Sequence, residues 1–266
     1  MPLAAESPST AVDRTIAILE AVAARSSGMI NAEISRKLDI PKSSASYILR
    51  ALERHGYLRR DGENGKYRLG LKVLNLGRGA LNGVDVREVA LPIMRTLVEH
   101  VHITSHLAIL DGTQAVYVER VESPGFVKMD TWVGRRMEIY STSVGKALVS
   151  QLPEAQVQAI LRDRGMKKRT PTTITNPARF LRELELVRER GHAFDDEENS
   201  AGVRCVAAPV FNAAGAVEAA LNVTGTTQQV NRETLPRIID AVKDSARRIS
   251  TQLGYRPTRV AAGNRK

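Results

Sequence analysis

The fold of this chain is decided by residues 31–70, NAEISRKLDIPKSSASYILRALERHGYLRRDGENGKYRLG. This stretch predicts a short helix over residues 32–39, because Asn31 is a good N-cap and the apolar residues that follow share one helix face. A second helix is expected to start at Pro41 and to be closed by Gly56, since these residue types are favoured at those two ends. Two helices separated by so tight a break are typical of a helix-turn-helix.

A helix before this stretch and a hairpin at its end complete the motif. Apolar side chains recur at helical spacing upstream, at Val12, Ile16, Leu19, Val22 and Ala23. Residues 57–70 predict two short strands joined by a turn rich in glycine and asparagine. Three helices followed by a basic hairpin indicate a winged helix-turn-helix.

The helix after Pro41 has one apolar and one polar face when its residues are placed ~100° apart. The apolar face, expected to be core, holds Ala45, Ile48, Leu49 and Leu52. The polar face carries small hydroxyls, a tyrosine and arginines, which suit base edges and phosphates in a major groove. A solvated helix face is the alternative, and the basic hairpin directly behind the helix favours DNA. The expected DNA contacts are Lys42, Ser43, Ser44, Ser46, Tyr47, Arg50, Arg54, Arg59, Arg60, Lys66 and Arg68.

The charge balance supports a nucleic-acid partner. The 266 residues contain 39 Lys and Arg against 29 Asp and Glu, a formal net charge of +10 at pH 7, which attracts polyanions. Residues 1–83 carry 13 basic and 8 acidic side chains, and residues 84–266 carry 26 and 21. The first third therefore has about twice the charge density of the rest. Aromatic residues make up only 4%, which favours double-stranded DNA over a single strand held by stacking.

The single cysteine and the hydropathy pattern point to a compartment. Cys205 cannot form an intramolecular disulfide and fits a reducing environment. No apolar run approaches the roughly 20 residues of a membrane span, and the first residues show no basic leader followed by an apolar core. We therefore expect a cytoplasmic protein with no membrane partner.

A chain of this length favours about two domains. The expected division is a disordered arm over residues 1–11, the winged helix-turn-helix over 12–70, a linker helix over 71–83, a second domain over 84–254 and a disordered basic tail over 255–266. The helices expected in the second domain are 86–100, 143–152, 153–165, 177–191 and 235–254, and the strands are 104–110, 115–121, 126–133, 203–211 and 217–225. This mixture predicts an α+β protein.

The second domain shows no catalytic constellation. Residues 143–146, SVGK, fail as a phosphate loop, which needs a glycine where Tyr140 stands and a serine or threonine where Ala147 stands. His102 and His106 are four residues apart, but no nearby acid or thiol completes a metal ligand set. We expect no metal, no cofactor and no enzymatic activity.

A run of four acids, residues 195–198, leaves three interpretations open. The run could form a solvated loop, answer the charge of Arg204, or accept hydrogen bonds from the hydroxyls of a ligand. Cys205 is most simply a small buried residue, with a place in the wall of a polar pocket as the alternative.

At this point the sequence resembles the IclR family of bacterial transcription regulators. The resemblance rests on residues 31–70, on STSVGKAL at 141–148 and on GHAFDDEENSAGVRCVAAPVFNAAGAVEAALNVTG at 191–225, and it extends over about residues 10–254. It implies a winged helix-turn-helix, a linker helix and a C-terminal α/β, GAF-like effector domain that binds a small, usually acidic or aromatic, metabolite. It also implies dimers formed through the DNA-binding end, which pair again as tetramers.

The family pattern implies where the effector would bind. The implied residues are Phe126, Met129, Ser143, Val144, Asp195, Cys205, Asn222 and Thr224. Relatives often carry Gly-Ala where this chain has Ser143 and Val144, and serines where it has Asn222 and Thr224, so the identity of the ligand does not carry over. The residues agree with this placement, because the N–H groups of residues 143–145 open a helix and suit an anion such as an organic acid. Asn222 and Thr224 alternate on one strand and point to the same side.

These observations favour a ligand-responsive regulator, a repressor or an activator, that binds palindromic double-stranded DNA as a homodimer or tetramer. Leu71, Leu74 and Leu81 of the linker helix are the expected dimer contacts beyond the first helix. A DNA-binding regulator without an effector is the first alternative. An enzyme acting on an anionic substrate is the second, and the missing catalytic residues oppose it.

Overall fold

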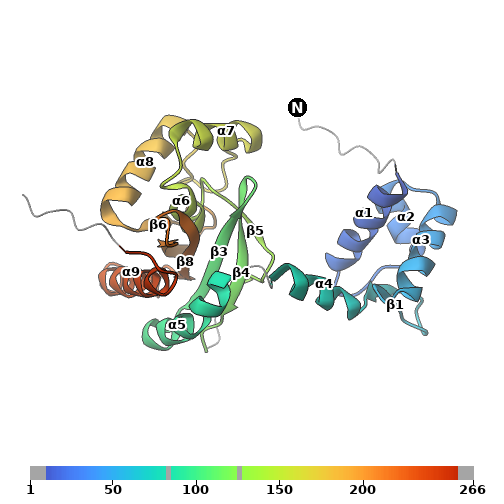
Figure 1. The fold of residues 1–266 in the computed structure, drawn as a ribbon. Coiled ribbons are helices and arrows are strands. Elements are labelled where there is room, and N and C mark those ends of the chain that lie inside the picture. The colour runs from blue at the N-terminus through green and yellow to red at the C-terminus, as the bar shows by residue number, and fades with distance from the viewer. Residues whose placement is uncertain (1–9, 82–84, 125–127, 257–266) are drawn as a thin grey trace, which may run out of the picture. The chain divides into compact units, whose positions relative to one another are not determined.

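The computed structural model of the chain describes residues 10–81, 85–124 and 128–256. It divides into two compact units, Met1–Gly83 and Val84–Lys266 (Figure 1). The arm expected to be disordered lies outside the described residues except at its end, where Thr10 caps the first helix and Ala11 begins it. Most of the predicted basic tail also lies outside them.

The smaller unit is the winged helix-turn-helix that the sequence predicts. Its elements are α1 (Ala11–Ala23), α2 (Asn31–Leu38), α3 (Lys42–Arg54), β1 (Leu58–Arg60), β2 (Tyr67–Leu69) and α4 (Lys72–Leu81). The two strands pair antiparallel, with Leu58 opposite Leu69. The core gathers side chains from the three helices and the hairpin, among them Ile18, Ile34, Leu49, Leu58 and Tyr67. The predicted apolar face of α3 is confirmed, because all four of its residues are buried.

The start of α2 corrects the predicted cap. Ile30, and not Asn31, is the N-cap, because the Glu33 carboxylate three residues into the helix accepts the Ile30 N–H at 3.0 Å. The amide of Asn31 instead donates to the carbonyl of Lys42 at 3.3 Å. Asn31 thus ties α2 to the first residue of α3, and Asp39 makes the break between them in the left-handed region at φ 52°.

The helix predicted from the first apolar stripe is confirmed as α1, and only part of the stripe is buried. Val12 and Ile16 are 68% and 51% exposed, whereas Ile18, Ala21 and Val22 are buried. α1 packs on α2 and β2. Leu71, Leu74 and Leu76, at and after the start of α4, are also exposed, and the side chain of Leu81 lies outside the described part of the chain.

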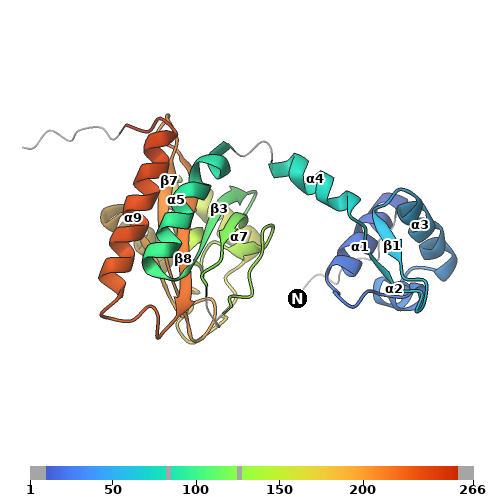
Figure 2. The ribbon, with the colours of Figure 1, turned by 90° about the horizontal axis from the view of Figure 1, so that it is seen from below.

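The larger unit is built on one antiparallel sheet in the order β5-β4-β3-β8-β7-β6. The strands are β3 (Thr104–Asp111), β4 (Gln114–Val121), β5 (Arg136–Glu138), β6 (Ala193–Asp196), β7 (Val203–Phe211) and β8 (Val217–Thr226). The helices are α5 (Asp85–Val101), α6 (Ser143–Val149), α7 (Glu154–Arg164), α8 (Pro177–Arg190) and α9 (Leu235–Gln252). α5 and α9 lie side by side on one face of the sheet, and α6, α7 and α8 lie on the other (Figures 1 and 2). The α+β prediction is confirmed.

Small residues bring α6 close to the sheet. The strands face this helix with alanines, among them Ala108, Ala207 and Ala220. At Gly145 a Cβ would lie 2.3 Å from the Cα of Ile139, so only glycine fits there. The close approach fixes the first turn of α6 above the strands.

One predicted element of this unit is wrong. The described part of the expected strand 126–133 is irregular, and a strand forms later, at Arg136–Glu138. Trp132 and Val133 are exposed and Gly134 adopts φ 91°, so the segment lacks the buried face of a strand. The acid run begins inside β6, at the edge of the sheet. Among the described helices, none is long and apolar enough to cross a membrane.

Candidate functional site

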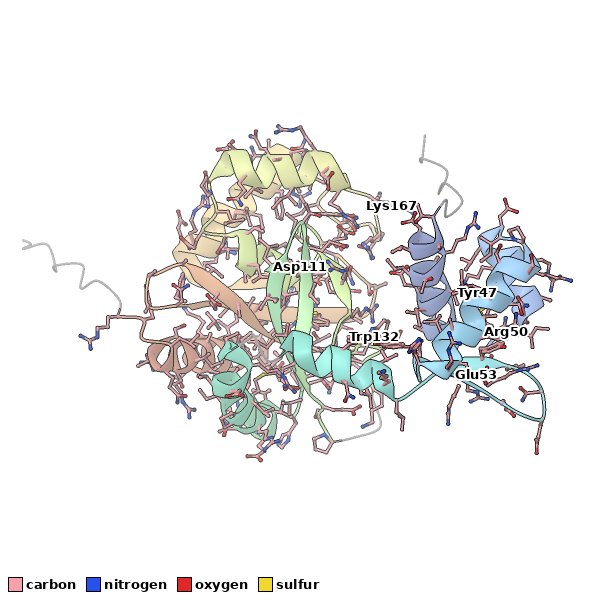
Figure 3. The ribbon with its side chains drawn as sticks, turned by 45° about the vertical axis from the view of Figure 1, so that its right-hand side comes forward. Tyr47, Arg50, Glu53, Asp111, Trp132 and Lys167 are labelled. Carbon is pink, nitrogen blue, oxygen red and sulfur yellow. The ribbon has the colours of Figure 1, made fainter. Side chains whose placement is uncertain are left out.

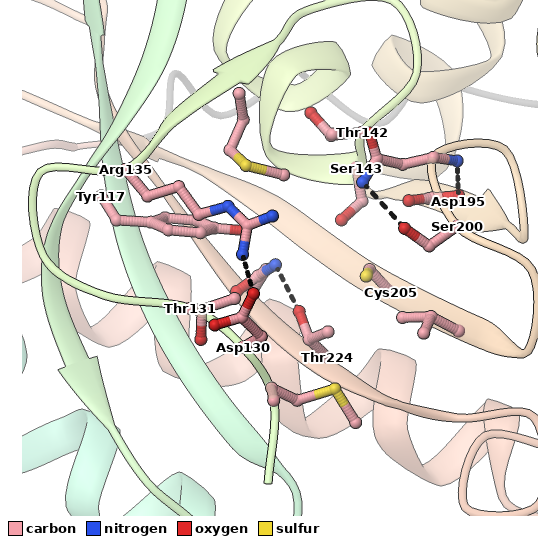
Figure 4. Close-up of a pocket in the computed structure, with 15 residues that line it drawn as sticks. Tyr117, Asp130, Thr131, Arg135, Thr142, Ser143, Asp195, Ser200, Cys205 and Thr224 are labelled. Carbon is pink, nitrogen blue, oxygen red and sulfur yellow. Dashed lines mark hydrogen bonds and ion pairs between the residues drawn. The ribbon is translucent and has the colours of Figure 1, made fainter. Parts of the chain in front are cut away.

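A cavity of about 240 Å³ lies in the larger unit between the first turn of α6, the sheet and the segment before β5 (Figure 4). The lining residues with polar side chains are Tyr117, Asp130, Thr131, Arg135, Thr142, Ser143, Asp195, Asn199, Ser200, Asn222 and Thr224. The rest comprises Met129, Met137, Val203 and Cys205. The cavity therefore brings together Met129, Ser143, Asp195, Cys205, Asn222 and Thr224 from the set implied by the family pattern.

The floor is a row of three polar side chains on adjacent strands. Asp195 on β6 is opposite Cys205 on β7, which is opposite Thr224 on β8. Asp195 is 2% exposed, and its Oδ1 accepts the backbone N–H of Glu198 at 2.7 Å. Burial raises the pKa of Asp195 to about 7, and the nearby Glu198 carboxylate adds to the rise. Asp195 thus keeps its proton to a much higher pH than an ordinary aspartate does.

Cys205 carries a protonated thiol. Burial is the main cause that raises the pKa of this thiol, and the Asp195 carboxylate beside it raises the pKa further. A thiol in such surroundings is a poor nucleophile and packs as a small polarisable group.

A chain of hydrogen bonds runs from the mouth of the cavity to its floor. The Thr131 hydroxyl lies 2.7 Å from His106 Nε2, and His106 Nδ1 lies 3.0 Å from Asn222 Oδ1. The amide of Asn222 then donates to the Thr224 hydroxyl at 3.1 Å. Burial lowers the pKa of His106 to about 4, so the ring is neutral at pH 7. Because Asn222 Oδ1 also accepts the backbone N–H of His106, we assign the proton to Nδ1 and Thr131 donates to Nε2.

The same histidine supports the wall formed by Tyr117. The two rings stack with their centroids 4.3 Å apart. The sequence singles out His106 only through its spacing from His102. Among the described residues, no group of three or more His, Cys, Asp or Glu side chains is placed to hold a metal ion.

Arg135 supplies the positive charge of the lining. Its guanidinium lies over the ring of Trp132, 4.8 Å from the centroid, and 3.9 Å from the Asp130 carboxylate. Asp130 is almost fully exposed, so this ion pair is weak. The backbone fixes Arg135 beside the sheet, because the amide of Tyr117 donates to its carbonyl at 3.1 Å. Sequence reasoning missed Arg135, which directly follows the segment expected to be a strand.

The first turn of α6 contributes a hydroxyl and fewer amides than expected. The side chain of Thr142 caps the helix by accepting the Gly145 N–H at 3.1 Å, so that amide is not available to an anion. The hydroxyl of Ser143 is buried and has no hydrogen-bond partner within the described residues. Val144, implied to line the pocket, packs in the core with Ala147. Phe126 lies outside the described residues.

Lys146 holds the acid run in place. Its ammonium is fully buried, donates to the Phe194 carbonyl at 2.9 Å and to the Glu198 carboxylate, and lies 3.7 Å from Glu183. Burial raises the pKa of Glu198, and the Lys146 charge opposes that rise. The glycine and the lysine of the SVGK stretch therefore have structural roles: Gly145 allows the close approach, and Lys146 anchors residues 194–198.

Of the interpretations left open for the acid run, the structure realises one, because Asp196 accepts a hydrogen bond from Arg204 Nε at 2.7 Å and so pairs with that charge. Asp195 lies in the wall of the cavity, and its hydrogen bond to a ligand hydroxyl stays a prediction.

The smaller unit presents the predicted DNA-contacting residues on α3 and the hairpin. Tyr47 is 73% exposed, and Figure 3 shows it extending from α3 together with Arg50. The other exposed members of the set are Lys42, Ser43, Arg54, Arg59 and Arg60, and the half-buried ones are Ser44, Ser46, Lys66 and Arg68. Ser46 and Arg50 share a groove with Arg60 and Asn64, so helix and hairpin form one polar surface.

Comparisons with known proteins identify both units. The model of the IclR helix-turn-helix domain matches residues 11–62, and that of the bacterial transcriptional regulator IclR C-terminal domain matches residues 78–251. The HTH-type transcriptional regulator XynR of Escherichia coli (strain K12) is 34% identical over 244 residues, 92% of this chain and 97% of XynR. KdgR of the same strain is 36% identical over 223 residues, 84% of this chain and 85% of KdgR.

Solved structures agree. The Thermotoga maritima IclR has a TM-score of 0.79 at 30% identity, covering 92% of this chain and 98% of that one. An IclR homolog from Microbacterium hydrocarbonoxydans, complexed with 4-hydroxybenzoate, has a TM-score of 0.79 at 25% identity, covering 92% and 99%. This chain therefore belongs to the IclR family of bacterial transcriptional regulators, which are ligand-responsive DNA-binding proteins and not enzymes.

Proposed function

We propose that the protein binds operator DNA through α3 and the β1–β2 hairpin, binds a small carboxylic acid in the cavity of the larger unit, and changes its affinity for DNA when that acid is bound. The observation that carries the ligand is the Arg135 guanidinium, which supplies the positive charge in the lining of the cavity. A guanidinium presents several N–H donors that match a carboxylate.

The DNA surface fits a symmetric site. One recognition helix reads few base pairs, so a dimer on a palindrome supplies the specificity that one unit lacks. The smaller unit exposes apolar side chains that such a dimer would bury, namely Val12 and Ile16 on α1 and Leu71 and Leu74 at the start of α4. We infer a homodimer, with a tetramer as a further stage. The same activity places the protein in the cytoplasm, where bacterial DNA lies.

The ligand acts by preferring one arrangement of the protein. A tenfold change in operator affinity requires ~1.4 kcal/mol of preferential binding to one state. α4 lies between the DNA-binding elements and the larger unit in the chain, and its glycines, Gly77 and Gly79, have no neighbouring atoms within 4 Å of a built Cβ. We propose that α4 is the element whose conformation changes when the ligand binds.

The test is a titration of organic acids followed by calorimetry, with operator binding measured in parallel. Arg135→Gln is expected to weaken the best acid by about tenfold or more, since a charged hydrogen-bond partner is removed. The matched control is Arg136→Gln, which removes the neighbouring arginine that pairs with Asp111 outside the cavity. Equal affinity of both variants and the parent would place the acid elsewhere.

A further inference from the structure

We infer that the larger unit has a second ligand site, which binds an amphipathic carboxylate such as a medium-chain fatty acid. The site is a groove of about 510 Å³ between α8, α9 and the end of β7. None of the described residues that line this groove also lines the cavity at the first turn of α6. The inference therefore stands apart from the proposed function.

The groove exists because β6 is shorter than its neighbour β7. β6 pairs with β7 over residues 204–207, whereas β7 continues to Phe211. Among the described strands, none pairs with this side of residues 208–211, and the stretch lies open between α8 and α9, which cover opposite faces of the sheet (Figure 1). Pro209 lies in the open stretch, and a proline at a sheet edge discourages the pairing of an added strand. This favours a small molecule over an extended peptide.

The buried part of the groove is apolar. Its buried residues with hydrocarbon side chains are Val187, Ala208, Pro209 and Ala246. Beside them the half-buried rings of Phe211 and Tyr255 stack, with their centroids 4.9 Å apart. The buried hydroxyl of Ser250 is already satisfied, because it accepts the Phe211 N–H at 2.9 Å and donates to the Ala246 carbonyl at 2.7 Å. The buried surface thus suits a hydrocarbon body.

The exposed rim of the groove is positively charged. Its charged side chains among the described residues are Arg188, Lys243, Arg247 and Asp244. Asp244 forms an ion pair with Arg247, so the positive charges of the other two remain. The Arg188 guanidinium donates to the Ser150 carbonyl at 2.7 Å, and the Lys243 ammonium donates to the Arg190 carbonyl at 2.8 Å. These bonds hold the two cations at the groove and leave further N–H groups for an anion.

An apolar floor beside a cationic rim matches a ligand with a hydrocarbon body and one anionic head. The volume of about 510 Å³ equals roughly seventeen times the share of one water molecule in the liquid, which is room for an acid of about ten carbons. Two added methylene groups are expected to raise the affinity by about tenfold as long as the groove can bury them. The carboxylate would lie at the rim, beside Arg188 and Lys243.

The experiment uses the full-length protein and calorimetry, with each probe kept below its critical micelle concentration. The probes are decanoate, octanoate, 1-octanol and octylammonium. Decanoate is expected to bind about tenfold more tightly than octanoate. Octanoate is expected to bind about threefold or more tightly than 1-octanol and octylammonium, since the rim cations are exposed. This preference for the carboxylate should decrease as the salt concentration rises.

Variants locate the bound acid. Lys243→Gln combined with Arg247→Gln is expected to weaken decanoate by about tenfold, because two cations leave the rim. Thr251→Trp places an indole over the groove from an exposed position on α9 and is expected to block binding. The matched control is Arg248→Gln, at an exposed arginine of α9 that lines the separate groove against α5. Arg135→Gln, in the cavity, should also leave the affinity for decanoate unchanged.

Four results would overturn the inference. Decanoate might give no heat of binding, or octanoate and 1-octanol might bind equally well, which removes the role of the rim charge. Loss of decanoate affinity in Arg135→Gln and not in the Lys243 and Arg247 double variant would place the acid in the cavity. A smaller particle for Thr251→Trp in light scattering, with no decanoate bound to the parent, would show that a second copy of the chain covers the groove.

Discussion

His106 and Thr131 are joined by a hydrogen bond of 2.7 Å between the imidazole Nε2 and the threonine hydroxyl. Thr131 donates to this nitrogen because the ring is neutral, and burial keeps the ring neutral by lowering the pKa of His106 to about 4 from 6.5. In the unfolded chain the same ring takes up a proton near its ordinary pKa. The folded state therefore loses stability as the pH falls from about 6.5 towards 4.

Replacing His106 with glutamine is expected to remove this sensitivity to acid. The shift corresponds to about 3 kcal/mol between the two pH limits, and glutamine has no proton to gain. Urea unfolding at pH 7 and pH 4.5 measures the difference between variant and parent at each pH. His55→Gln, at an exposed histidine after α3, is the control. A difference for His106→Gln that does not change with pH would contradict the assignment of a neutral buried ring.

The contribution of Asp195 to stability changes with pH in the opposite direction from that of His106. Its pKa is raised from 3.8 to about 7, so the favourable contribution is complete below pH 3.8 and is lost as the pH rises through 7. Asp195→Asn keeps an oxygen for the Glu198 N–H and carries no charge. It is expected to gain stability on the parent between pH 4.5 and pH 8, by up to about 3 kcal/mol. Chemical unfolding at those two pH values tests this, and Asp196→Asn, at an exposed neighbour, should show no comparable gain.

Gly145→Ala is expected to be strongly destabilising. The added methyl would lie 2.3 Å from the Ile139 Cα and 2.6 Å from its carbonyl oxygen, so α6 must move, at a cost of about 3 kcal/mol or more. Thermal unfolding measures the effect. Gly77→Ala in α4 has open space around the new methyl and is expected to stabilise its helix by up to about 1 kcal/mol. Equal melting temperatures for the two variants would show that α6 does not approach the backbone so closely.

Arg50→Ala is expected to weaken operator binding by about 1–3 kcal/mol if its guanidinium reads a base. Removal of Arg59 and Arg60 together should instead reduce the dependence of binding on salt, by a log–log slope near 0.9 for each phosphate that is no longer neutralised. Fluorescence anisotropy at several salt concentrations distinguishes the two effects. Arg182→Ala, an exposed arginine on α8, is the control. Unchanged binding in both test variants would rule out α3 and the hairpin as the DNA surface.

Charges placed on the exposed leucines should separate the subunits. Leu71→Glu combined with Leu74→Glu puts two carboxylates where the proposed dimer buries apolar side chains. Light scattering at micromolar concentration is expected to show a smaller particle than the parent, with weaker operator binding. A monomeric parent, with or without DNA, would disprove the proposed assembly.

The sequence alone predicted those features of the fold that are set by residues close together in the chain. Residues 31–70 are recognisable because Pro41, Gly56 and the apolar face of α3 act locally. Asp195, Cys205 and Thr224, which form the floor of the cavity, were predicted only from the family resemblance. These residues are far apart in sequence and meet through strand register.

The missed residues depend on structure that sequence periodicity does not encode. Tyr117 joins the cavity because β4 turns the same face to α6 at Tyr117 as at Ala115. Arg135 joins it because the backbone of residues 134 and 135 forms hydrogen bonds with the backbone of Tyr117. Residues 126–133, FVKMDTWV, have the composition of a strand. A strand also needs one face that is buried against the rest of the protein.

The buried ammonium of Lys146 has a consequence for the history of the sequence. It neutralises carboxylates on two other segments, Glu198 beyond β6 and Glu183 on α8. Loss of the lysine alone would leave those carboxylates without their positive partner. Loss of one carboxylate would leave the positive charge of the lysine only partly neutralised. A single substitution of the lysine or of either carboxylate is therefore expected to lower the stability of the fold strongly. Across related chains, the three positions should therefore be inherited as a set or replaced together.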